Sequence, residues 1–267
     1  MLIDFHTHFF PDDIALKTVT KLGEEGNVQC FGDGTVHSLR RYMAEEGVDF
    51  SINLPIATRP EQVESINQKV IEFNKSSVDV IGFGTMHPKY NKVGNVREEL
   101  ESLKQNGVKG IKLHPEYQDF FPDDPMMTEI YEECTRLDLI IVFHAGRDVA
   151  FKEVHGTPKR FAQIRELNRH LKIVLAHMGG YRMWEEAESY VMGLHEVYLD
   201  TSFCTEIDDW LLKEMIFGHG AYKVLFGSDF PWERASVTKK KILDLGLGAM
   251  YENMIFFQNA KRLLKIQ

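Results

Sequence analysis

Residues 2–10 read LIDFHTHFF and give the first indication of the fold. The stretch begins as a short run of apolar and β-branched residues, which is typical of a buried strand. The run ends in His6, Thr7 and His8, whereas a dinucleotide-binding domain needs a glycine-rich turn after its first strand. Because side chains alternate between the two faces of a strand, we expect Asp4, His6 and His8 to share one face. Two histidines with this spacing can point at a single ion.

Seven further runs of this kind follow, separated by amphipathic stretches. They read DFSINLP from Asp49, VDVIGFGTM from Val78, VKGIKLH from Val108, LIIVFH from Leu139, KIVLAH from Lys172, EVYLDTS from Glu196 and KVLFGSD from Lys223. Helical patterns lie at residues 61–75, 96–106, 126–137, 158–168, 184–192, 208–217 and 253–264. Eight strand–helix units in 267 residues predict an α/β fold, a closed (β/α)8 TIM barrel with an extra C-terminal helix. No linker interrupts the pattern, so we expect one domain over residues 1–267.

Composition excludes several classes of protein. The chain carries 31 basic and 40 acidic side chains, a net charge of −9, which is unlike a nucleic-acid or anionic-membrane binder. Its three cysteines form no CxxC pair, so they indicate neither a disulfide framework nor a thiolate zinc site. No apolar run approaches the roughly 20 residues of a membrane span, and no signal segment opens the chain. We therefore expect a cytoplasmic protein that acts on a small molecule, without nucleic-acid or membrane partners. The sequence is compatible with a homodimer.

The carboxyl ends of other predicted strands also carry polar side chains, namely Lys112, His114, His144, His177 and Asp229. In a barrel these ends meet at the rim that carries the active site. A lone histidine at such a place is more often a hydrogen-bonded structural residue than a ligand. The imidazoles of His6, His8, His144 and His177 and the carboxylate of Asp229 are different when taken together, because each unpaired buried group would cost roughly 1–3 kcal/mol. A divalent metal would satisfy them; these donors favour Zn²⁺, with Mn²⁺, Fe²⁺ and Co²⁺ chemically admissible.

The order and spacing of six segments carry a family resemblance. They read IDFHTHFFP, GIKLHP, IVFHAG, IVLAHMGG, YLDTS and VLFGSDFPW, and they span nearly the whole chain. The set resembles the amidohydrolase superfamily, and more narrowly its amidohydrolase-related branch, which includes the aminocarboxymuconate-semialdehyde decarboxylase-like proteins. The resemblance implies one metal bound by His6, His8, His144 and Asp229, with His177 beside the metal-bound water.

Lys112 and His114 stand where other members of the superfamily differ among themselves. Some of those members hold a second metal with a carboxylated lysine or a glutamate at the end of strand four. A carboxylated Lys112 that bridges two ions is therefore one alternative. We favour a lysine that lines the pocket or binds an anion, because the resemblance is to the single-metal branch.

The donor set and the resemblance predict a metal-dependent hydrolase. In this reaction a metal-activated water attacks the carbonyl of an amide, lactone or ester in a small carboxylated metabolite. Asp229 would accept and return the proton, and His177 would orient the water and stabilise charge on the attacked oxygen. Decarboxylation of an unsaturated carboxylic acid is the alternative on the same site. A TatD-like nuclease is a weaker alternative, given the acidic net charge and the absence of a strand-four glutamate.

Residues in the loops after the strands are expected to bind the substrate. Besides His114 and Lys112, we select Arg147 and Trp232. A guanidinium binds a carboxylate through two parallel hydrogen bonds, which suits Arg147 to an acidic substrate. The alternative for Arg147 is an exposed charge paired with Asp148. Trp232 would form a wall of the substrate pocket or pack against the last helix.

Overall fold

Parallel strands form the centre of the molecule. The computed structural model describes residues 1–266. The strands are β1 (Ile3–Thr7), β2 (Phe50–Asn53), β3 (Val80–Gly82), β4 (Gly84–Thr85), β5 (Gly110–Leu113), β6 (Ile140–Phe143), β7 (Lys172–Leu175), β8 (Val197–Asp200) and β9 (Val224–Leu225). They pair in chain order in two groups, β1 to β3 and β4 to β9, and every pairing within them is parallel.

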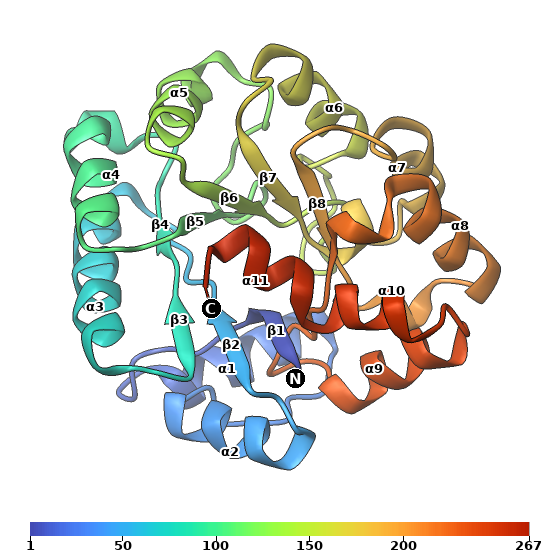
Figure 1. Ribbon diagram of the computed structural model, residues 1–267. Helices are drawn as coiled ribbons and strands as arrows, with labels where there is room; N and C mark the ends of the chain where they lie inside the picture. Colours follow the sequence, from blue (N-terminus) through green and yellow to red (C-terminus); the bar gives the residue numbers. More distant parts are fainter. Residues whose placement is uncertain (267) are drawn as a thin grey trace.

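Two junctions close the groups into one barrel. The backbone N–H of Phe83, between β3 and β4, donates to Asn53 O at 2.9 Å, so β3 and β4 are two parts of one predicted strand. At the other junction the N–H of Phe5 in β1 donates to Phe226 O, directly after β9, at 2.8 Å. Figure 1 shows the resulting ring of strands inside a ring of helices. The prediction of a (β/α)8 TIM barrel is confirmed.

Helices cover the outside of the strands (Figure 1). They are α1 (Ala15–Gly26), α2 (Val36–Glu46), α3 (Val63–Ser76), α4 (Val96–Gln105), α5 (Thr128–Arg136), α6 (Pro158–Leu167), α7 (Trp184–Tyr190), α8 (Asp209–His219), α9 (Ala235–Asp244), α10 (Ala249–Asn253) and α11 (Asn259–Leu264). Each helical pattern named above overlaps a helix of the structure, and α1, α2 and α9 lie outside those ranges. No helix within residues 1–266 has the length and hydropathy needed to cross a membrane.

The C-terminal helix closes the amino-terminal end of the barrel. Ala260, Leu263 and Leu264 of α11 form one buried cluster with apolar residues of the strands, among them Ile3 and Phe5. Figure 1 shows α11 lying across the opening of the ring. The extra helix is therefore confirmed, although residues 253–264 are not one regular helix. A π-helical turn at Met254–Gln258 separates α10 from α11.

A β-bulge in β1 corrects the predicted arrangement of its side chains. Asp4 pairs with Ser51 of β2, but Thr7 pairs with Asn53, so β1 has one residue more than its partner between these points. A bulge of this kind breaks the alternation of faces. Asp4 therefore does not share a face with the two histidines, and that prediction is wrong.

The contacts of Asp4 show where its side chain points instead. Its carboxylate accepts hydrogen bonds from the Ser228 backbone N–H, at 2.9 Å, and from the Ser228 hydroxyl, at 2.5 Å. That serine is also contacted by the hydroxyl of Tyr42, a residue of the outer helix α2. Asp4 thus connects β1 to the segment after β9 by hydrogen bonds. The bulge orients His6 and His8 toward the carboxyl-terminal rim.

Candidate metal centre

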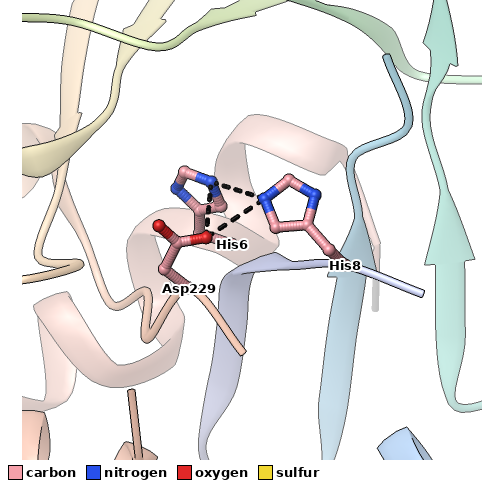
Figure 2. A group of neighbouring side chains, drawn as sticks. All are labelled: His6, His8 and Asp229. Carbon is pink, nitrogen blue, oxygen red and sulfur yellow. Dashed lines mark hydrogen bonds and ion pairs between the residues drawn. The ribbon is translucent and has the colours of Figure 1, made fainter. Parts of the chain in front are cut away.

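Three side chains from the two ends of the chain meet at the rim. His6 and His8 lie at the end of β1, and Asp229 follows β9. The Nε2 atoms of the histidines are 3.2 Å apart, and Asp229 Oδ1 lies 3.4 Å from that of His6 and 3.1 Å from that of His8 (Figure 2). All three side chains are buried. The backbone helps to place them, because Asp229 has a left-handed φ of 67° and its N–H donates to His6 O at 2.8 Å.

These donors fit a divalent cation. A tetrahedral site with metal–ligand bonds of about 2.0–2.1 Å places its ligands about 3.3 Å from one another, close to the three separations above. His8 donates its Nδ1–H to Leu54 O at 2.9 Å, which leaves a lone pair on Nε2. Asp229 Oδ1 is buried and accepts no hydrogen bond from residues 1–266. Two acceptor atoms that face each other at 3.1 Å repel unless a cation lies between them.

The charge state of Asp229 agrees with this role. Burial by itself would raise the pKa of Asp229, but the neighbouring His6 and His8 outweigh burial and hold the pKa below its usual range. Burial also lowers the pKa of His8, although the neighbouring Asp229 opposes the shift. The centre therefore offers an ionised carboxylate and an imidazole that stays neutral, which is the form in which histidine binds a metal.

His144 and His177 lie next to these three residues. His144 Nδ1 is 3.1 Å from His177 Nε2, and the ring centroids of His6 and His177 are 5.4 Å apart. Burial lowers the pKa of His144 to about 4 and holds that of His177 well below its usual value. Among the described residues, the metal-type group that contains His144 joins it to His114 and Asp148 rather than to His6 and His8. The four-ligand set thus remains a prediction.

Lys112 is buried beside the same centre. Its Nζ lies 3.4 Å from His6 Nε2. Burial lowers the pKa of Lys112 to about 8, against the opposing charges of Asp200 and Asp229. At pH 7 the side chain is therefore mostly protonated and places a positive charge at the rim.

The other residues selected for substrate binding have different surroundings. The ring of His114 stacks on that of His144 at 4.2 Å, and its Nε2 lies 3.4 Å from Asp148 Oδ2. The ring of Trp232 is 5.3 Å from that of His8. Arg147 is exposed, and within residues 1–266 its guanidinium makes no ion pair or hydrogen bond. Asp148 thus contacts His114 rather than Arg147, which contradicts the alternative pairing.

Two residues at the end of β8 were missed as site residues. Asp200 Oδ2 lies 2.8 Å from His6 Nδ1, and Ser202 Oγ lies 2.8 Å from His177 Nδ1. Both side chains are fully buried. The signal was available, because Asp200 ends a predicted strand in the same way as His144 does.

Comparison with known proteins adds the family. A family model described as amidohydrolase matches residues 3–266. The chain belongs to this amidohydrolase family. The predicted resemblance is thereby confirmed, and the protein is a metal-dependent enzyme of the amidohydrolase type. A search of curated proteins gives no match to this amidohydrolase.

Solved structures share the fold of the amidohydrolase over its full length. A 5-carboxyvanillate decarboxylase from Sphingomonas paucimobilis is 17% identical with a TM-score of 0.72, and the match covers 100% of this chain and 99% of that one. A dihydroxybenzoic acid decarboxylase from Polaromonas sp. JS666, with bound manganese and an inhibitor, is 17% identical with a TM-score of 0.72 over 99% and 96%. A probable 2-pyrone-4,6-dicarboxylic acid hydrolase from Acinetobacter baumannii is 15% identical with a TM-score of 0.69 over 99% of both chains.

Proposed function

We propose that this amidohydrolase hydrolyses an amide, lactone or ester of a small carboxylated metabolite. The observation that carries the proposal is the buried Oδ1 of Asp229, which faces Nε2 of His6 and His8 and accepts no hydrogen bond from the part of the chain that the structure describes. We propose that these three residues, together with His144, hold one divalent cation. Nitrogen and carboxylate donors at these separations favour Zn²⁺. The manganese in the Polaromonas structure supports Mn²⁺ as the second choice.

A divalent cation held there supplies Lewis acidity and lowers the pKa of a water molecule. Asp229 is ionised and lies at the edge of the centre, so it can accept a proton and return it to a leaving group. His177 is kept neutral by burial, so its ring can take part in a hydrogen bond with a water or substrate oxygen. The ammonium of Lys112 attracts negative charge to the same place.

The substrate is proposed to be an anion. Arg147 presents an exposed guanidinium, without an ion-pair partner among the described residues, on the loop that follows β6. A substrate carboxylate can pair with it in a two-bond geometry. The half-buried ring of Trp232, beside His8, offers an apolar wall for the rest of the molecule.

Decarboxylation of an unsaturated or aromatic carboxylic acid is the second candidate. The buried cation of Lys112 favours it, because an ammonium at the centre itself can bind the carboxylate that is to be lost. The names of the Sphingomonas and Polaromonas structures support the same reading. In this reaction the ionised Asp229 would take a proton from a water molecule, leaving hydroxide, and pass it to the carbon that loses CO₂.

A substrate panel separates the two reactions. Metal-replete enzyme is incubated with carboxylated lactones, amides and esters and with unsaturated and aromatic carboxylic acids, and acid release and CO₂ are measured separately. We expect acid release without CO₂ from one of the first three classes, and loss of that activity in Asp229→Ala. Release of CO₂ with no hydrolysis would replace the first proposal by the second. Inertness of the metal-replete enzyme toward every class would contradict both.

A further inference from the structure

Asp200 determines which of the two ring nitrogens of His6 carries a proton. His6 Nδ1 lies 2.8 Å from Asp200 Oδ2, and Ser202 Oγ is a second neighbour at 3.2 Å. A carboxylate only accepts hydrogen bonds, so the proton of the neutral ring sits on Nδ1. The lone pair is then on Nε2, the atom that faces His8 and Asp229.

The same two residues determine the proton position on His177. The hydroxyl of Ser202 donates to Asp200 Oδ1, so its oxygen is left to accept the Nδ1–H of His177 at 2.8 Å. The backbone oxygen of Ser202, which can only accept, lies 3.4 Å from the same nitrogen. His177 therefore also carries its proton on Nδ1 and has its lone pair on Nε2.

Hydrogen bonds fix the Asp200 carboxylate in the orientation that sets the proton position on both rings. Its Oδ1 accepts the backbone N–H groups of His177, at 3.0 Å, and Ser202, at 3.1 Å, besides the serine hydroxyl. Gly227 leaves the space for the His6–Asp200 pair, because a Cβ there would lie 3.0 Å from Cβ of His6 and 3.3 Å from Cβ of Asp200.

We infer that Asp200 and Ser202 are positioning residues that hold His6 and His177 with the proton on Nδ1 and the Nε2 lone pair turned toward the metal centre. The inference rests on the metal site proposed above and is independent of the reaction. Carboxylates that hold metal-binding histidines in this way commonly raise metal affinity.

The hydrogen bonds of His144 limit what His177 can do. His144 donates its Nε2–H to Arg147 O at 3.1 Å, so Nδ1 of the neutral ring carries a lone pair. This Nδ1 lies 3.1 Å from Nε2 of His177, which also carries a lone pair. Two lone pairs at this distance require a cation or a proton near both. In the neutral state His177 thus accepts a hydrogen bond from water and does not donate one to the attacked oxygen, which narrows its predicted role to orienting the water.

Imidazole nitrogen NMR tests the inference without metal or substrate. Uniformly ¹⁵N-labelled, metal-free protein is examined at neutral pH by long-range ¹H–¹⁵N correlation, which distinguishes a protonated from an unprotonated ring nitrogen. We expect His6 and His177 to be protonated at Nδ1. His219 serves as the internal reference of opposite tautomer, because its Nε2–H donates to Val197 O at 2.9 Å and its Nδ1 accepts the Gly193 N–H. An unprotonated Nδ1 on His6 or on His177 would overturn the inference.

Asp200→Asn gives the sharpest variant. The donors around Oδ1 demand the amide oxygen, so the amide NH₂ must face His6 Nδ1. We expect the tautomer of His6 to reverse and the metal affinity, measured by competition with a chelator, to fall about 10- to 100-fold. An unchanged tautomer together with unchanged affinity would contradict the inference.

Two further variants separate positioning from general damage. Ser202→Ala removes the acceptor of the His177 Nδ1–H, so His177 should no longer be held in the Nδ1-protonated tautomer, whereas His6 should keep its tautomer. Glu233→Gln is the matched control, because this buried carboxylate accepts hydrogen bonds from the Phe203 N–H, Thr205 and Thr238, and none from an imidazole. It should leave both tautomers unchanged, and a change there would contradict the assignment to Asp200. Correct tautomers in a wild-type protein that binds no metal would instead refute only the metal site.

Discussion

At the scale of single residues, the centre depends on acceptor atoms that face one another. His8 and Asp229 are such a pair at 3.1 Å, so removal of either leaves an incomplete donor set. We predict that His8→Ala and Asp229→Ala each abolish both bound metal and turnover.

His177→Ala should keep most of the metal, because His6, His8 and Asp229 remain, and should lower kcat about 10²- to 10⁴-fold. Metal content and kcat measured on the same samples check this, and loss of metal in the His177 variant would make that residue a ligand.

A second residue-scale prediction concerns stability and pH. Burial lowers the pKa of His219 from 6.5 to about 4, and the partners of its ring are Val197 O at the start of β8 and the Gly193 N–H. The unfolded chain therefore binds a proton between these values that the folded chain does not, so stability is full above pH 6.5 and falls as the pH drops toward 4. Between pH 7.5 and 5 this histidine should cost about 2 kcal/mol of the free energy of unfolding. In urea titrations, the free energy of unfolding of His219→Gln should fall by about 2 kcal/mol less than that of the wild type between pH 7.5 and 5. An equal fall in both proteins would contradict this role of His219.

At the scale of elements, the end of β9 allows a direct test of close packing. Gly227→Ala would push a Cβ against His6 and Asp200, so we predict about a tenfold loss of metal affinity, similar to a disturbed supporting residue. Gly218→Ala in α8 is the control, because a Cβ there would meet no described residue within 4 Å. Competition with a chelator measures the metal affinity of both variants. Equal metal affinities in Gly227→Ala and Gly218→Ala would contradict the prediction that the space at Gly227 matters.

The element α11 should contribute stability without contributing to the site. Leu264 is 1% exposed in the cluster that closes the amino-terminal end of the barrel, away from the metal centre. We predict that Leu264→Ala lowers the free energy of unfolding by about 2–5 kcal/mol. Metal affinity should stay the same. Leu167→Ala, at a side chain that is 79% exposed, should change neither quantity. Loss of metal affinity in Leu264→Ala would contradict this separation.

The elements also show what the sequence could and could not reveal. Strand ends rich in His and Asp predicted the rim and most of its polar residues, because parallel strands end at the same edge. The sequence did not reveal the bulge in β1, which moves Asp4 off the face of His6, since one extra residue leaves no periodic trace. Nor did it reveal the left-handed backbone of His177 and Asp229, which is fixed by tertiary packing rather than by residue type.

At the scale of the whole molecule, the barrel joins the two ends of the chain. Closure of β1 against the segment after β9 is what places Asp229 beside His6 and His8, more than 200 residues away in sequence. Asp200 reaches His6 by the same closure, whereas Ser202 reaches His177 because their strands β8 and β7 are neighbours. Sequence patterns predicted this topology, whereas the pairings of individual nitrogen and oxygen atoms required the folded coordinates.

The metal centre predicts a definite number of divalent ions per chain. Elemental analysis of wild-type protein, reconstituted with Zn²⁺ and freed of loosely bound metal, should give one ion per chain. The same treatment should leave Asp229→Ala with none. A wild-type protein that retains no ion, or an Asp229→Ala variant that retains as much as the wild type, would contradict the metal centre on which the proposed function depends.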